Sequence, residues 1–175
     1  MQIVVDTREQ APLDFASVGI PTQRAKCYPG DYTIAGLEQK YAVERKGVAS
    51  GGGSDLVGTI VQLMRGERGR GAADGGSLRF MRELAAMSAI IRAGGVAYVA
   101  VTRPRAWFAS HQYRSELSPA ALFGKVASLV ARFGVPFVFF ASDYELRDHM
   151  AIEARHVWRR YGLAPLAQWD EGGNA

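Results

Sequence analysis

The chain has 175 residues, of which 48% are hydrophobic and 22% are charged, and this composition is ordinary for a soluble globular protein of one domain. Its single cysteine, Cys27, excludes an internal disulfide and fits a reducing cytosol. No apolar run reaches the roughly 18 residues that a membrane span requires. The net charge of +4 favours a polyanionic partner such as nucleic acid.

Four strands are expected in the first part of the chain, at residues 2–6, 22–28, 31–36 and 40–46. Within the fourth of these, "KYAVERK", successive side chains point to opposite faces of the sheet. Glu44 and Lys46 are therefore expected on one face, and Arg45 on the other.

Helices and strands are expected to alternate in the remainder of the chain. Apolar spacing and capping residues predict helices at residues 55–64, 77–92, 118–133 and 142–161. Apolar runs predict strands at 94–102 and 135–140, and the aromatic segment 103–117 is expected to be irregular. The helix at 77–92 is expected to bury a stripe made of Met81, Leu84, Ala85, Ser88 and Ile91.

This order predicts an α/β domain with a central mixed β-sheet flanked by α-helices. The domain is expected to span residues 1–163, because no internal linker divides them. Residues 164–175 are expected to form a loose C-terminal tail.

Acidic residues mark the strand ends of the first part of the chain. Asp6, Asp31 and Glu44 lie at strand edges, and Asp55 opens the next helix. Adjacent strand ends can bring such carboxylates together, which is unfavourable unless a cation joins them. Oxygen ligands without a His or Cys cluster suit Mg²⁺ or Mn²⁺ rather than zinc. An ammonium on the face of Glu44, as Lys46 is, can position a water or stabilise a pentavalent phosphate.

A second interpretation of these charges stays open at this point. Acids at strand ends are also common turn residues. Charged side chains on an edge strand are often a protection against edge-to-edge aggregation. Spacing alone does not decide between this interpretation and a chemical site.

Three motifs occur in order along the first part of the chain: "DTRE" at 6–9, "GDYTI" at 30–34 and "VERK" at 43–46. Together with "DL" at 55–56, they resemble the signature G-D-x-x-V-E-R-K-x-x-x-D of the XPF/Hef-type structure-specific endonucleases. The resemblance extends over about residues 2–161, particularly to phage-type single-domain members. It implies the restriction-endonuclease-like core of that superfamily.

The resemblance also implies a catalytic set. Asp31 and Glu44 would be metal ligands, with Asp6 joining them directly or through water. Lys46 would be the catalytic lysine, orienting a metal-bound water for in-line attack on phosphorus.

Other residues of the motifs receive supporting roles from the same resemblance. Arg8 and Glu9 would support the site after the first acid. Arg45 is expected to have a structural or partner-contacting role. Asp55 corresponds to the acid that ends the signature.

The chain departs from the family pattern between the lysine and this final acid. The family places three residues there, whereas eight residues, from Gly47 to Ser54, separate Lys46 from Asp55. Because "DLVGTI" matches the start of the family's next helix, an inserted loop is favoured. Loss of the final acid's role is the alternative.

Arginines outside the acidic set are candidates for DNA contact. The glycine-rich segment 65–76 carries Arg65, Arg68 and Arg70, and arginines on flexible backbone can track phosphates. Arg45 is a further candidate. A solvated surface loop explains the same segment equally well.

The resemblance implies a metal-dependent DNA endonuclease, using Mg²⁺ or Mn²⁺, that cuts branched, flapped or junction DNA and leaves a 5′-phosphate and a 3′-hydroxyl. Two alternatives stay open: a weak or inactive DNA-binding or scaffold subunit of a nuclease complex, and a Holliday-junction resolvase or exonuclease on the same core.

The setting of this activity is also an expectation. Many relatives carry a helix-hairpin-helix module or a helicase, so DNA targeting here is expected from the nuclease domain, a homodimer or a separate partner. The N-terminus, "MQIVVDTREQ", lacks the basic start of a signal peptide. A cytoplasmic, nucleoid-associated location and phage or prophage origin are expected, without a membrane partner.

Overall fold

The computed structural model describes residues 1–47, 56–67 and 75–162, and within them one mixed sheet forms the centre of the molecule. The strand order is β2-β1-β3-β4-β5-β6. The pairs β1–β2, β4–β5 and β5–β6 are parallel, and β3 runs antiparallel to both β1 and β4. The bounds are β1 (Ile3–Asp6), β2 (Thr22–Ala25), β3 (Tyr32–Ile34), β4 (Tyr41–Lys46), β5 (Val96–Val101) and β6 (Phe137–Phe139).

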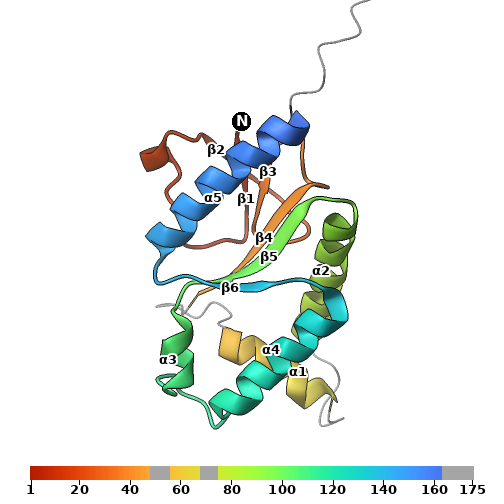
Figure 1. The fold of residues 1–175 in the computed structure, drawn as a ribbon, viewed down its shortest axis with the longest axis vertical. Helices are drawn as coiled ribbons and strands as arrows, with labels where there is room; N and C mark the ends of the chain where they lie inside the picture. The colour runs from red at the N-terminus through yellow and green to blue at the C-terminus, as the bar shows by residue number, and fades with distance from the viewer. Residues whose placement is uncertain (48–55, 68–74, 163–175) are drawn as a thin grey trace, which may run out of the picture.

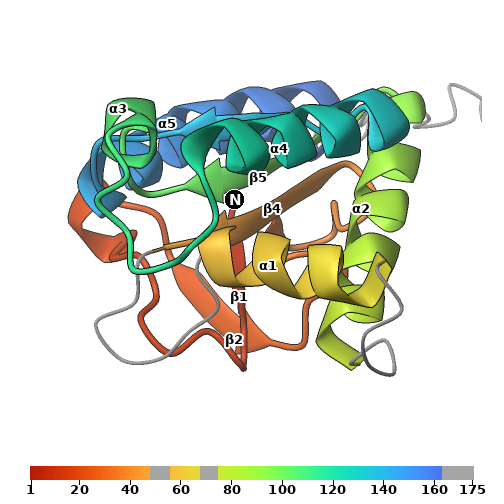
Figure 2. The same cartoon turned by 90° about the horizontal axis from the view of Figure 1, so that it is seen from below.

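Helices cover both faces of this sheet (Figure 1). Helix α5 lies on one face, and α1, α2 and α4 lie on the other, as the view in Figure 2 also shows. The bounds are α1 (Leu56–Glu67), α2 (Gly75–Arg92), α3 (Arg105–Ala109), α4 (Pro119–Phe133) and α5 (Asp143–Val157). The prediction of an α/β domain with a central mixed sheet flanked by helices is confirmed. None of the helices in the described part of the chain could cross a membrane.

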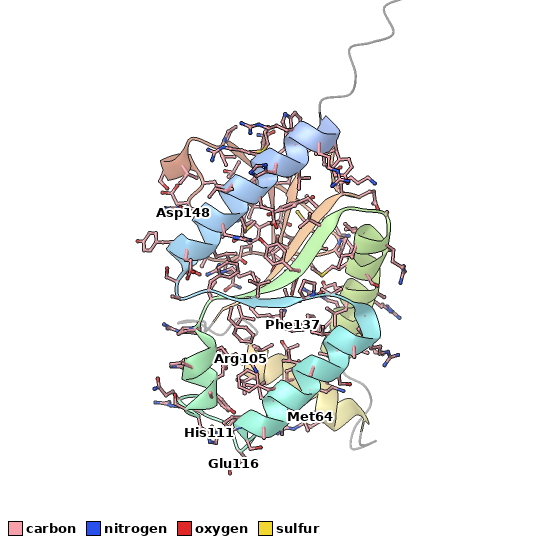
Figure 3. All side chains as sticks on the ribbon, viewed as in Figure 1. Met64, Arg105, His111, Glu116, Phe137 and Asp148 are labelled. Atoms are coloured by element: carbon pink, nitrogen blue, oxygen red, sulfur yellow. The ribbon has the colours of Figure 1, made fainter. Side chains whose placement is uncertain are left out.

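The alternation of side chains along β4 creates two separate hydrophobic cores. Tyr41 and Val43 point toward α5, into a core to which Leu146 of that helix also belongs. Ala42 points to the other face, into the core that α1, α2 and α4 share. Side chains fill the space on both sides of the sheet in Figure 3, where Phe137 of β6 is labelled. Glu44 and Lys46 continue the row of Ala42, so they lie on the face that α2 covers.

Helix ends follow the capping residues of the sequence. The Ser118 hydroxyl accepts the N–H of Ala121 at 3.3 Å, and Gly134 ends α4 in the left-handed region with φ of 68°. Ser142 accepts the N–H of Glu145 at 3.2 Å at the start of α5. The α-helical hydrogen bonding of α5 ends at Val157, and a π-helical turn, Trp158–Gly162, completes the predicted length.

Two expectations about local structure are wrong in part. Segment 103–117 is not wholly irregular, because Pro104 starts the short helix α3, in which Phe108 is buried. The predicted stripe of α2 is confirmed in part: Leu84 and Ser88 are buried, and Met81 and Ile91 are partly buried against the core, but Ala85 is exposed. The buried face also includes residues outside that stripe, namely Phe80, Glu83, Met87 and Ile90. The expected loose tail, 164–175, lies outside the described residues.

Candidate active site

The three acids predicted at strand ends lie in one row across adjacent strands. The pairs Val5–Tyr32 and Tyr32–Val43 set the register of β1, β3 and β4. One residue further along, the N–H of Asp6 donates to the carbonyl of Asp31 at 2.8 Å, and the N–H of Asp31 donates to the carbonyl of Val43 at 2.8 Å. Residues paired across strands point to the same face of a sheet. Asp6, Asp31 and Glu44 therefore share the face that α2 covers.

The glycine of the "GD" motif permits this close approach. Gly30 has a φ of 83°, in the left-handed region that favours glycine. A Cβ at this position would lie 2.7 Å from the carbonyl oxygen of Val43, a backbone atom that cannot move aside. The turn before β3 can thus place Asp31 against β4 only with glycine at position 30.

Glu44 and Lys46 form a buried ion pair on this face. The ammonium of Lys46 donates to Oε1 of Glu44. The side chain of Lys46 is 6% exposed and that of Glu44 is 2% exposed. The same ammonium lies 4.9 Å from the centre of the Phe80 ring of α2. The second carboxylate oxygen of Glu44, Oε2, is buried and has no hydrogen-bond partner in the described part of the chain. A buried acceptor without a partner is costly, and a bound cation would satisfy it.

Asp31 is held next to this pair by the backbone of β4. Its Oδ2 accepts the N–H of Arg45 at 2.8 Å. Burial and then the charge of Glu44 raise the pKa of Asp31 to about 8, although the bond from Arg45 and the charge of Lys46 oppose the rise. Two carboxylates compete for one ammonium here, which is the arrangement that a divalent cation stabilises.

Asp6 is engaged differently from the other two acids. Its Oδ1 accepts the N–H of Arg8 at 2.7 Å and the Nε of Arg8 at 2.7 Å. Its Oδ2 accepts Nη2 of Arg8 at 3.2 Å and the N–H of Cys27 at 2.7 Å. Burial would raise the pKa of Asp6, but these bonds outweigh it and hold the pKa below its usual value. Both oxygens of Asp6 therefore brace the turn that leads to Asp31, and its predicted role as a metal ligand stays a prediction.

Arg45 lies on the opposite face of the sheet, as the alternation in β4 predicts. Its Nη1 donates to the carbonyl of Ala11 at 2.6 Å, and its Nη2 pairs with Asp143 of α5 at 2.9 Å. Glu9 lies 3.5 Å from the same guanidinium. These contacts favour the structural role of Arg45 over its candidate role in DNA contact, and they give Glu9 a supporting position behind the sheet.

Some of the predicted site residues lie elsewhere or are not described. Arg65 is exposed near the end of α1. Asp55, Arg68 and Arg70 lie outside the described residues, so their predicted roles stay predictions.

The sequence-based prediction missed one residue of this face, Glu83 of α2. Its side chain is 3% exposed and forms an ion pair with Arg79, one turn earlier, at 3.0 Å. Burial and then the charge of Glu44 raise the pKa of Glu83. The spacing of the large apolar residues of α2 could have revealed it. Phe80, Leu84 and Met87 lie on one side of the helix, in the core, and position 83 lies on the same side.

The residues of this face fit a magnesium ion. Within residues 1–47, 56–67 and 75–162, no three His, Cys, Asp or Glu side chains are gathered closely enough to enclose a metal. Mg²⁺, however, is commonly bound by one or two carboxylates together with waters and substrate phosphates. Asp31 and Glu44 supply such a pair, and the unpartnered Oε2 of Glu44 supplies an open oxygen. An all-oxygen donor set suits Mg²⁺ or Mn²⁺ better than zinc, whose structural sites use Cys and His.

Comparison with solved structures places this arrangement in a known fold. The chain is similar to XPF from Aeropyrum pernix, with a TM-score of 0.63 and 16% identity over 100% of this chain and 70% of that chain. It is also similar to XPF from Aeropyrum pernix in complex with DNA, with a TM-score of 0.60 and 17% identity over 96% of this chain and 70% of that chain. No protein-family model matches the chain, and no curated protein matches its sequence. The chain therefore has the fold of the XPF nuclease structures.

Proposed function

We propose that the protein is a metal-dependent DNA endonuclease. The observation that carries the proposal is the group formed by Asp31, Glu44 and Lys46 on one face of the sheet, inside a fold shared with XPF structures. One of those structures is in complex with DNA, which supports DNA as the substrate. Branched, flapped or junction DNA is the substrate class that the motifs imply.

The chemistry divides between the cation and the chain. A bound Mg²⁺ would supply a Lewis acid for the scissile phosphate and an activated water. Asp31 and Glu44 would hold it, because their oxygens face the same space and Oε2 of Glu44 is open. The ammonium of Lys46 would stabilise the negative charge of the pentavalent phosphate. Because this ammonium is buried, the interaction would be stronger than in water. Arg8, whose side chain is 46% exposed, lies beside Asp6 at the edge of the site, where a phosphate can reach it.

A cutting assay with four DNA substrates tests the proposal. Flap, fork, Holliday-junction and linear duplex DNA are incubated with the protein in Mg²⁺, Mn²⁺ or EDTA. Metal-dependent cutting is expected, with a preference for one of the branched substrates. Glu44→Ala and Lys46→Ala are expected to abolish it.

Glu116→Ala is the matched control, because Glu116, labelled in Figure 3, is an exposed acid in the segment between α3 and α4 and does not belong to the group of Asp31, Glu44 and Lys46. This variant is expected to cut like the parent. Undiminished cutting by Glu44→Ala would contradict the site. If the parent binds branched DNA but cuts none of the substrates, the scaffold interpretation replaces the nuclease.

A further inference from the structure

We propose that Arg103 and Arg105, at the end of β5 and the start of α3, bind backbone phosphates of the DNA strand that is cut. This inference rests on the proposed function, because it names the surface that would hold the substrate against the acids of the site. It adds a phosphate-binding surface on the β5 side of the site to the exposed Arg8 on the β1 side.

The pairing of β4 with β5 places these arginines next to the site. The two strands are parallel, and Lys46 lies opposite Val101 where they end. The chain stays beside β4 for one further residue, since the N–H of Thr102 donates to the carbonyl of Lys46 at 3.3 Å. Arg103 follows directly. Figure 1 shows α3 at this end of β4 and β5, at the lower left.

The spacing of the strands brings the neighbours of the scissile phosphate within reach. Adjacent strands are about 4.8 Å apart and two residues advance about 6.6 Å, so the backbones of Arg103 and Lys46 are on the order of 8 Å apart. One DNA strand carries a phosphate per about 3.4 Å of helix axis. A phosphate held near Lys46 therefore has neighbours on the same strand that the two arginine side chains can contact.

The two guanidinium groups are exposed and receive no counter-charge from the protein. Neither forms an ion pair or a hydrogen bond through its side chain within the described part of the chain. By contrast, Arg8, Arg45 and Arg79 each pair with an acid. Residues 103–115 include three arginines and no aspartate or glutamate. This segment thus has one sign of charge, which attracts a polyanion such as DNA.

Aromatic rings hold both guanidinium groups in place. The guanidinium carbon of Arg103 lies 5.9 Å from the centre of the Trp107 ring. That of Arg105, which is labelled in Figure 3, lies 4.6 Å from the centre of the Phe123 ring of α4. A guanidinium that stacks on a ring can still donate from its edge to phosphate oxygens. Stacking also reduces the side-chain freedom that is lost when a ligand binds.

The short helix that follows these arginines is anchored in the hydrophobic core. Phe108 is 1% exposed, and its ring centre lies 5.7 Å from that of Phe139 of β6. The ring centres of Trp107 and Phe108 lie 4.9 Å apart. Phosphate contacts from such a fixed element would set the position of the strand relative to Lys46, since backbone contacts determine the register of a protein on DNA.

Fluorescence anisotropy with a labelled flap duplex in EDTA, at several salt concentrations, tests the inference. The double variant Arg103→Gln with Arg105→Gln is expected to reduce the slope of log K against log salt by about 2, because each phosphate contact contributes about 1.

Arg132→Gln is the matched control. Arg132 is also exposed and its guanidinium also stacks on a ring, at 5.2 Å from the centre of Phe133. It lies in the last turn of α4, at the right of Figure 1, whereas α3 lies at the left. This variant is expected to keep the slope of the parent.

The double variant Arg103→Lys with Arg105→Lys separates charge from packing. It keeps both positive charges but removes the planar groups that stack on Trp107 and Phe123. It is expected to keep the slope of the parent, because the slope counts neutralised phosphates. If it loses as much of the slope as the glutamine variant does, the arginines act through the packing of α3 and the inference is overturned.

The outcomes separate this inference from the proposed function. If the parent cuts DNA and Glu44→Ala does not, while the glutamine variant keeps the slope of the parent, only the role of the arginines is overturned. If the glutamine variant loses slope but the parent cuts no substrate, the arginine surface stands and the nuclease activity fails. If the parent neither binds nor cuts DNA, both fail.

Discussion

The carboxylate of Asp31 accepts the backbone N–H of Arg45 at 2.8 Å, so the acid of one strand is bonded to the peptide that follows Glu44 on the next. This bond fixes the relative position of the two carboxylates independently of their charges. The site is therefore prearranged by backbone hydrogen bonding, while its acids repel one another.

The first prediction concerns pH and stability without metal. An unfolded Asp titrates near 3.8, whereas the pKa of Asp31 in the folded protein is about 8, so the folded state binds more protons between these values. Stability contributed by Asp31 is thus present at low pH and lost as the pH rises toward 8. In EDTA, the melting temperature is expected to fall across this window.

The Asp31→Asn variant checks the cause. It is expected to lose the part of the pH dependence that Asp31 causes. At pH 8 it is expected to melt at least about 2–4 °C above the parent, which is the shift that about 1 kcal/mol produces in a domain of this size. Asp148→Asn, at an exposed acid of α5 that Figure 3 labels, is the control and should keep the pH dependence. An Asp31→Asn protein with the parent's pH profile would show that this carboxyl titrates normally.

The second prediction concerns the turn before β3. Gly30→Ala is expected to destabilise the protein by about 1–3 kcal/mol or more, because it adds a clash with the Val43 carbonyl to the strain of a positive φ. Gly19→Ala is a control that separates the two effects, since Gly19 has a φ of 71° but no atom within 4 Å of a built Cβ. Urea unfolding should show the larger loss for Gly30→Ala. Equal losses would mean that the close approach to β4 is unimportant.

The third prediction concerns the role of Arg45. Arg45→Met removes the bonds to Ala11, Glu9 and Asp143, so it is expected to lower stability by about 1–3 kcal/mol. The salt dependence of DNA binding should be unchanged, because the guanidinium faces away from the acids. A DNA-contacting arginine would instead reduce the slope of log K against log salt by about 1. Fluorescence anisotropy at several salt concentrations distinguishes the two roles.

The fourth prediction concerns Asp6 and acid unfolding. The hydrogen bonds from Arg8 and Cys27 keep the pKa of Asp6 below 3.8, so its contribution to stability is present above that pH and lost as the pH falls below it. Arg8→Met is expected to raise the pKa of Asp6 and to move the acid unfolding midpoint to higher pH. Circular dichroism between pH 2 and 6 measures this midpoint. The Cys27 thiol is expected to stay protonated over this pH range, because burial raises the pKa of Cys27 to about 12.

The sequence could predict which face of the sheet carries the acids, because successive side chains of a strand point to opposite faces. Once "VERK" is a strand, the faces of Glu44, Arg45 and Lys46 are determined. The partners of Arg45 could not be predicted, because Asp143 is 98 residues away and belongs to a helix on the far face. Nor does the pattern around Asp6 show that Arg8 would engage both of its oxygens.

The full buried face of α2 could not be predicted for a related reason. Ala85 and Ser88 are small enough to satisfy either a buried or an exposed position, and a charged residue such as Glu83 is normally assigned to the solvent side. Only the packing of α2 against β4 determines that Phe80 and Glu83 belong to the buried face. The missed acid is thus a consequence of tertiary contacts that override a weak local pattern.

Single-turnover cutting of an end-labelled flap duplex in Mg²⁺ by the parent and by Lys46→Met tests the central claim most directly. The account predicts that Lys46→Met loses about 100-fold or more in rate, the magnitude of one electrostatic group in a site, while it still binds the flap and Mn²⁺. Cutting by Lys46→Met at a rate within about twofold of the parent would contradict the assignment of this face as the active site.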